Sequence, residues 1–173
     1  GRLCYASVGG GSASHLTMEL LKTEAGVAIV HVPYRGFPPA VNDLLGGSID
    51  AMFATIPAVL PQVRAGRLRA LAVTASKRND AAPGVPSVAE LGYPRLESPA
   101  WIGLLAPGGT AGQVVQRLNA ATVRVMSAAE VREALGRQGF DVAAGSPEEF
   151  SRWIRSESEK WARVIRESGA KAD

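Results

Sequence analysis

The sequence has 173 residues, of which 46% are hydrophobic and 20% are charged, the composition of a globular protein rather than of a disordered chain. Nineteen Lys and Arg against 16 Asp and Glu leave a formal net charge of +3, and the cations are scattered. Nucleic acid is therefore not an expected partner. No apolar run approaches the ~20 residues that span a bilayer. The single cysteine, Cys4, excludes a disulfide within the chain.

In the first half of the chain, short apolar segments alternate with segments of helical periodicity. The predicted strands cover residues 3–7, 27–32, 49–53 and 68–74, and the predicted helices cover residues 13–25, 37–45, 57–65 and 87–91. Strands that are apolar throughout and alternate with helices indicate a parallel sheet covered on both faces.

The second half of the chain is predicted to be mostly helical, after a boundary near residue 97. Short strands are expected at residues 101–106 and 140–143. Capping-box patterns predict helix starts at Thr110, Ser127 and Ser146, the last of these helices continuing to about residue 168.

A glycine loop precedes the first predicted helix and is the main candidate for a binding site. The loop Gly9-Gly10-Gly11-Ser12 lacks the lysine of a phosphate-binding P-loop, and Ser14 stands where a dinucleotide fingerprint needs glycine. The start of a helix favours any anion, so a carboxylate suits this loop as well as a phosphate. An ordinary helix cap with a flexible entry loop is the alternative.

No constellation of residues indicates catalysis or a metal site. Ser12, His15 and Asp50 lack the nucleophile elbow of a hydrolase. His31 falls in an apolar strand and is interpreted as a core or rim residue. Two histidines and one cysteine are too few for a convincing metal site. The chain is therefore expected not to be an enzyme and to need no metal or cofactor.

The loops that end parallel strands meet at one edge of a sheet, where ligands of open α/β folds bind. In this chain they are expected at residues 7–12, 33–36 and 54–56, with Ser, Gly, Tyr and Thr side chains and one cation, Arg35. Such a lining suits a small polar anion held by backbone amides and hydroxyls.

Several motifs in register resemble the Bug-type receptors, the extracytoplasmic solute-binding proteins of tripartite tricarboxylate transporters. The motifs are Gly9-x-Gly11-Ser12-x-x-His15-Leu16, His31-Val32-Pro33-Tyr34-Arg35-Gly36, Asp43-Leu44-Leu45-Gly46-Gly47-x-x-Asp50, Ala65-Gly66-Arg67-Leu68-Arg69-Ala70-Leu71-Ala72-Val73-Thr74, Val85-Pro86-Ser87-Val88-Ala89-Glu90, Trp101-x-Gly103-Leu104-x-Ala106-Pro107, Arg117-Leu118-Asn119 and Pro147-Glu148-Glu149-Phe150. The resemblance runs through essentially the whole chain.

The resemblance implies a type II periplasmic-binding-protein fold and a cleft that binds a di- or tricarboxylate or an acidic amino acid. It also implies a periplasmic location, with the membrane components of the transporter as partners. The ligand-binding residues that it implies are Ser7, Gly9, Gly11, Ser12, His15, Tyr34, Ala54 and Thr55.

The chain resembles only the later portion of such a receptor. The resemblance implies that residues 1–97 are the second, β/α ligand-binding domain and that residues 98–173 are the C-terminal part of the first domain, with the N-terminal part of that domain expected to be missing. No signal-peptide pattern is found. We expect the apolar stripe Phe150, Trp153 and Trp161 to be exposed and to drive homo-oligomerisation. The alternative function is that of a truncated paralogue that binds no ligand and serves as an oligomeric structural or interaction protein.

Overall fold

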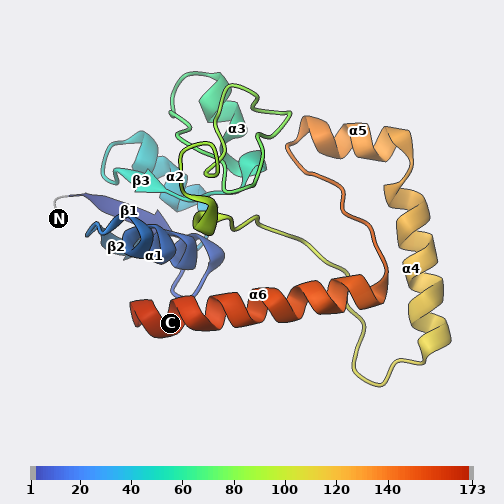
Figure 1. Ribbon diagram of the computed structural model, residues 1–173. Coiled ribbons are helices and arrows are strands. Elements are labelled where there is room, and N and C mark those ends of the chain that lie inside the picture. Colours follow the sequence, from blue (N-terminus) through green and yellow to red (C-terminus); the bar gives the residue numbers. More distant parts are fainter. Residues whose placement is uncertain (1–2, 172–173) are drawn as a thin grey trace.

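Three short parallel strands form the sheet, in the order β2-β1-β3. The central strand β1 (Cys4–Ser7) pairs with β2 (Val30–Pro33) on one side and with β3 (Ala51–Met52) on the other. Figure 1 shows the computed structural model, which describes residues 3–171. The predicted α/β class with a parallel sheet is present.

Helices cover both faces of this sheet. Successive side chains of a strand point to opposite faces, so neighbouring residues of β1 contact different helices. Tyr5 of β1 contacts Glu19 of α1 (Ala13–Ala25), whereas the next residue, Ala6, packs with Ala40 of α2 (Phe37–Leu45). Helix α3 (Ile56–Arg64) follows β3. Each of these helices begins shortly after the carboxyl end of a strand, so their amino ends share one edge of the sheet with the strand ends.

The second half of the chain extends away from the sheet and returns to it (Figure 1). After the 3₁₀ turn η1 (Pro94–Leu96), an extended segment leads to α4 (Gly112–Met126) and α5 (Ala129–Arg137). The long helix α6 (Pro147–Ser168) then runs back to α1. Its Val164 joins a core of apolar residues with Leu20, Val88 and Leu96.

Helix α6 begins with the predicted capping box. The Ser146 hydroxyl accepts the Glu149 amide at 3.2 Å, and the Glu149 carboxylate accepts the Ser146 amide at 2.8 Å. The other two predicted boxes are wrong: α4 is capped at Ala111 and α5 at Ala128, without side-chain bonds. No helix within residues 3–171 is sufficiently long and apolar to span a membrane.

Several predicted strands are absent, because an extended segment becomes a strand only where another strand offers backbone partners. Residues 68–74 make one isolated bridge, Val73 to Ser87, and residues 101–106 and 140–143 pair with no strand in the described chain. The second strand starts at Val30 rather than at residue 27. Of the predicted helix at residues 87–91, residue 87 makes the bridge with Val73 and residues 88–91 form turns. The domain division at residue 97 stays a prediction.

Candidate functional site at the start of helix α1

The glycine loop connects the central strand to α1 and is closed by its own hydrogen bonds. Gly9 and Gly11 have φ values of 129° and 72°, a region that favours glycine. The Ser12 hydroxyl donates to the Gly9 carbonyl at 2.7 Å and accepts the His15 amide at 3.3 Å. Ser12 is thus the N-cap of α1, as the alternative interpretation of this loop expected, and it also fixes the loop that enters the helix.

Side chains from the strand and from the helix hold the amides of this loop. The Ser7 hydroxyl is fully buried and accepts the Gly9 amide at 3.2 Å. The Gly11 amide donates to Nδ1 of His15 at 3.0 Å, and the Val8 amide donates to the Ser14 hydroxyl at 3.1 Å. The structure therefore brings five predicted site residues into one hydrogen-bonded unit, which we call the α1 loop: Ser7, Gly9, Gly11, Ser12 and His15.

The buried rings of Tyr5 and His15 and the partly buried ring of His31 lie at the α1 loop. His15 and His31 are stacked with centroids 4.0 Å apart and an angle of 7° between their planes, and Tyr5 stacks on His31 at 4.9 Å. Nε2 of His31 lies 2.6 Å from the Ser7 hydroxyl. A stack of rings at the site thus joins β1, β2 and α1.

A buried carboxylate completes this cluster. Glu19 accepts the Tyr5 hydroxyl at 2.7 Å and is paired with Lys22 at 2.7 Å. Burial alone would raise the pKa of Glu19, but the hydrogen bonds from Lys22 and Tyr5 outweigh it and lower that pKa. Burial and the adjacent Glu19 raise the pKa of Tyr5 far above its ordinary value. At neutral pH the cluster therefore contains a carboxylate and an uncharged phenol.

The remaining predicted site residues follow the two outer strands. The Tyr34 amide donates to the Ser7 carbonyl at 2.9 Å, while its hydroxyl donates to Asp43 at 2.7 Å, which raises the pKa of Tyr34. Ala54 and Thr55 follow β3, and Thr55 is the N-cap of α3 without a side-chain capping bond. No hydrogen bond joins Ala54 or Thr55 to the α1 loop within the described residues.

The strand order explains why these loops belong to one edge. The chain passes from β1 to β2 on one side of the central strand and then to β3 on the other side. The connection that follows β1 therefore leads away from β3. A crevice at such a switch point, outside the carboxyl ends of the strands, is where open α/β sheets bind ligands. The amino ends of α1 and α3 both lie there and favour negative charge.

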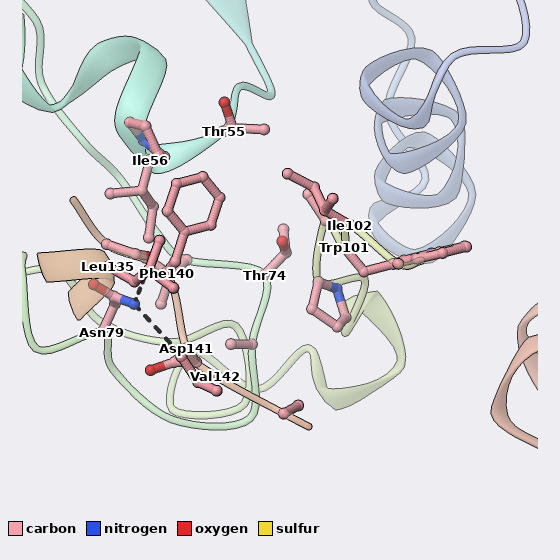
Figure 2. A pocket seen from close by; sticks show the side chains of 18 of the residues that line it. Thr55, Ile56, Thr74, Asn79, Trp101, Ile102, Leu135, Phe140, Asp141 and Val142 are labelled. Carbon is pink, nitrogen blue, oxygen red and sulfur yellow. Dashed lines mark hydrogen bonds between the residues drawn. The ribbon is translucent and has the colours of Figure 1, made fainter. Parts of the chain in front are cut away.

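A large open cavity of about 2150 Å³ lies between the two halves of the chain. In Figure 2, Thr55 and Ile56 lie across this cavity from Trp101 and Ile102. Asn79 holds one edge by donating to the Gly139 carbonyl at 3.2 Å. The cavity exceeds the roughly 300–1,000 Å³ of small-molecule pockets. Its lining is chiefly apolar; it includes Ala54 and Thr55 but omits the α1 loop, so only the predicted site residues that follow β3 border this cavity.

Sequence reasoning missed three polar partners of the loop: Ser14, Glu19 and His31. His31 was expected to be a core or rim residue, and it is partly buried as expected, but it also contacts Ser7. That contact follows from the register of β1 and β2, where Ser7 lies opposite Pro33. The sequence contains a signal for this contact. Tyr5 and Ser7 are two residues apart, as are His31 and Pro33, and residues two apart in a strand point to the same face of the sheet.

The three residues that were considered for a catalytic triad, Ser12, His15 and Asp50, do not all lie together in the structure. Asp50 accepts the Cys4 amide at 2.7 Å at the amino end of β1, whereas Ser12 and His15 lie beyond its carboxyl end. Within residues 3–171 no group of three or more His, Cys, Asp or Glu side chains is arranged to hold a metal ion.

Comparison with known proteins identifies relatives along almost the entire chain. The family model described as tripartite tricarboxylate transporter family receptor matches residues 1–170. BugT of Bordetella pertussis is 40% identical over 171 residues, which are 99% of this chain and 52% of that protein. The chain thus spans about half the length of BugT and of a UPF0065 protein of Pseudomonas sp. that is 42% identical over 166 residues.

Solved structures share the fold closely. A protein of R. palustris solved with adipate has a TM-score of 0.88 and 34% identity, over 98% of this chain and 56% of its own. MatC from Rhodopseudomonas palustris, solved with bound malate, has a TM-score of 0.79 and 32% identity, over 95% of this chain and 57% of its own. These similarities confirm the predicted fold class.

Proposed function

Because this chain belongs to the family of tripartite tricarboxylate transporter receptors, we propose that it binds a small carboxylate at the α1 loop, as an extracytoplasmic receptor. Members of this family are receptors rather than enzymes, so the chain is not an enzyme. The proposed location is the periplasm, and the proposed partners are the membrane components of the transporter.

The observation that carries this proposal is the closed α1 loop at the end of the central strand. Its glycines place no side chain over the backbone, and Ser7, Ser12 and His15 hold the loop through hydrogen bonds within the protein. Helix geometry leaves the Ala13 and Ser14 amides at the head of α1 without an intrahelical acceptor. A carboxylate oxygen is an acceptor of suitable charge for these amides.

The ligand class is inferred from the charge of the site and from the relatives. Adipate and malate, the ligands of the two structural neighbours, are both dicarboxylates. Thr55 at the head of α3 is placed on the opposite side of the switch point, where it suits a second polar group of the ligand. We propose a di- or tricarboxylate or an acidic amino acid, with Tyr34 beside the α1 loop on the β2 side and Ala54 and Thr55 on the β3 side.

A thermal-shift series tests this proposal. Adipate, malate and citrate at millimolar concentration are each added to the protein, and a ligand that binds the folded state raises Tm. Ser12→Ala removes the cap of α1, and Ser146→Ala removes the equivalent cap of α6, each at a cost of about 1 kcal/mol. We expect only Ser12→Ala to diminish the shift caused by the ligand. An absence of any shift, or an equal loss in both variants, contradicts the proposal.

Self-association is the second candidate function, and exposed apolar residues favour it. They are not the expected ones: Phe150, Trp153 and Trp161 are half-buried, because Phe150 stacks on Trp153 and Trp161 packs against the core. Trp101 is 46% exposed and Ile102 is 88% exposed, beside Leu104 and Leu105, in the extended segment that borders the cavity. Such a patch favours association, and we propose a second copy of this chain as its occupant. Light scattering after size-exclusion chromatography tests this, because Ile102→Ser should convert a dimer into a monomer. A monomeric wild type contradicts it.

A further inference from the structure

Both histidines of the sequence lie in one stack at the α1 loop. One is hydrogen-bonded to a backbone amide of the loop directly, and the other is connected to a second amide through Ser7. His15 accepts the Gly11 amide directly at 3.0 Å. His31 lies 2.6 Å from the Ser7 hydroxyl, which accepts the Gly9 amide. The protonation of two imidazoles is thereby connected to the backbone of the loop.

The contact with Gly11 fixes the protonation state of His15. An imidazole nitrogen accepts a hydrogen bond only while it carries no proton, so Nδ1 of His15 must be unprotonated and the neutral ring carries its proton on Nε2. A second proton would make Nδ1 a donor facing the Gly11 N–H. One of these two groups would then have to move away.

The contact of His31 with Ser7 does not impose the same restriction. Nε2 of His31 can donate to the Ser7 oxygen, while the Ser7 hydroxyl donates to the Gly9 carbonyl at 3.1 Å. A charged His31 therefore retains its contact, and His15 is the member of the pair whose protonation disrupts the loop.

The charged side chains nearest the stack are Glu19 and Lys22. Glu19 lies 3.8 Å from Nε2 of His15, but it is shared with Lys22, which donates to both of its oxygens. Tyr5 faces the rings from β1 as a neutral phenol. Other charged and titratable groups on the neighbouring elements have partners of their own. The ion pairs are Arg95 with Glu24 and Lys160 with Glu157. The hydrogen bonds are Tyr34 with Asp43 and the Cys4 amide with Asp50.

We propose that neutral His15 is a positioning residue that holds the Gly11 amide of the carboxylate-binding loop, and that protonation of this ring releases the loop and weakens binding. This inference rests on the proposed function of the loop. The affinity for the ligand is therefore higher at neutral pH than at mildly acidic pH, and the residue responsible, His15, need not touch the ligand.

The positioning is tested first without any ligand. Imidazole ¹⁵N spectra report the tautomer of His15, and the backbone spectrum reports the Gly11 amide, between about pH 8 and pH 5, where imidazoles titrate. We expect the Nε2–H tautomer and a Gly11 shift that follows the titration of His15. In His15→Asn, Oδ1 can replace Nδ1 as acceptor without titrating, so the Gly11 shift should be flat. An Nδ1–H tautomer, or a Gly11 amide indifferent to pH in the wild type, overturns the proposal.

The effect on binding is tested with adipate and malate by calorimetry at the two ends of this range. Because adipate and malate themselves take up protons toward the acidic end, the two proteins are compared there: we expect the wild type to lose roughly three- to tenfold more affinity than His15→Asn, the contribution of one hydrogen bond. His15→Leu, which offers no acceptor, should bind weakly at both ends. An equal loss of affinity in the wild type and His15→Asn overturns the coupling. If Gly11 follows His15 but neither acid binds at any pH, the positioning stands and the proposed carboxylate function fails.

Discussion

The hydroxyl of Ser7 lies 2.6 Å from Nε2 of His31, which joins the end of the central strand to the strand beside it. Ser7 is fully buried, and its oxygen also accepts the Gly9 amide at 3.2 Å. The α1 loop is therefore anchored to the core of the sheet rather than only to its own helix. The consequences of this anchoring can be measured.

Ser7→Ala should destabilise the protein and weaken carboxylate binding together. The variant leaves the Gly9 amide and His31 without the Ser7 oxygen, a loss of about 1–3 kcal/mol for a buried polar group. Urea unfolding measures the stability. Ser98→Ala is the matched control, because Ser98 is also buried and its hydroxyl contacts Thr17, away from the loop. Ligand affinity should survive in the control.

Glu19→Gln should remove part of the acid sensitivity of the fold. Because the pKa of Glu19 is lowered in the folded protein, its ionisation stabilises the fold above the unfolded value near 4.5, and this contribution is lost as pH falls through the folded pKa. The difference in Tm between wild type and Glu19→Gln should be largest at neutral pH and should shrink below about pH 4.5.

The control for Glu19 is Glu133→Gln, which removes an exposed ion pair with Arg137 on α5. Exposed pairs contribute little, so this variant should follow the wild type at every pH. A Tm difference for Glu19→Gln that does not change with pH would argue against an ionised Glu19 in the folded cluster.

Gly103→Ala should disturb the contact between the extended segment and α6. A Cβ at Gly103 would lie 2.9 Å from Cε1 of Phe150 and 3.1 Å from Cζ3 of Trp101, closer than side chains normally pack. Overpacking of this kind costs about 1–3 kcal/mol. Near-ultraviolet circular dichroism and urea unfolding should both report the change, since Trp101, Phe150 and Trp153 form one aromatic cluster.

Gly136→Ala is the matched control, because nothing lies within 4 Å of a Cβ at this position of α5. Alanine is the better helix former by about 1 kcal/mol, so the control should be neutral or stabilising. Equal destabilisation by both substitutions would contradict the packing at Gly103.

Helices were predicted more accurately from the sequence than strands, and the reason is physical. Helix signals are local. The apolar spacing of Phe37, Val41 and Leu44 acts within α2, and the cap at Ser146 acts at the start of α6, so both are where they were expected. A strand needs a partner that is distant in the sequence. Residues 68–74 have the composition of a strand, yet only Val73 forms a bridge.

The candidate site shows the same limit. The loop from Gly9 to Ser12 and the cap at Ser12 are local, and the sequence identified both. The contact between Ser7 and His31 depends on strand register, and the pairing of Tyr5 with Glu19 depends on how α1 docks on the sheet. Neither follows from spacing along the chain.

A crystal structure of the protein with adipate or malate would test the central claim most directly. The account predicts a carboxylate oxygen at about 2.7–3.2 Å from a backbone amide at the start of α1 or from the Ser12 hydroxyl. The other end of the ligand should point toward Thr55. A ligand seated instead among the apolar residues from Trp101 to Leu105, with the α1 loop unoccupied, would contradict the account.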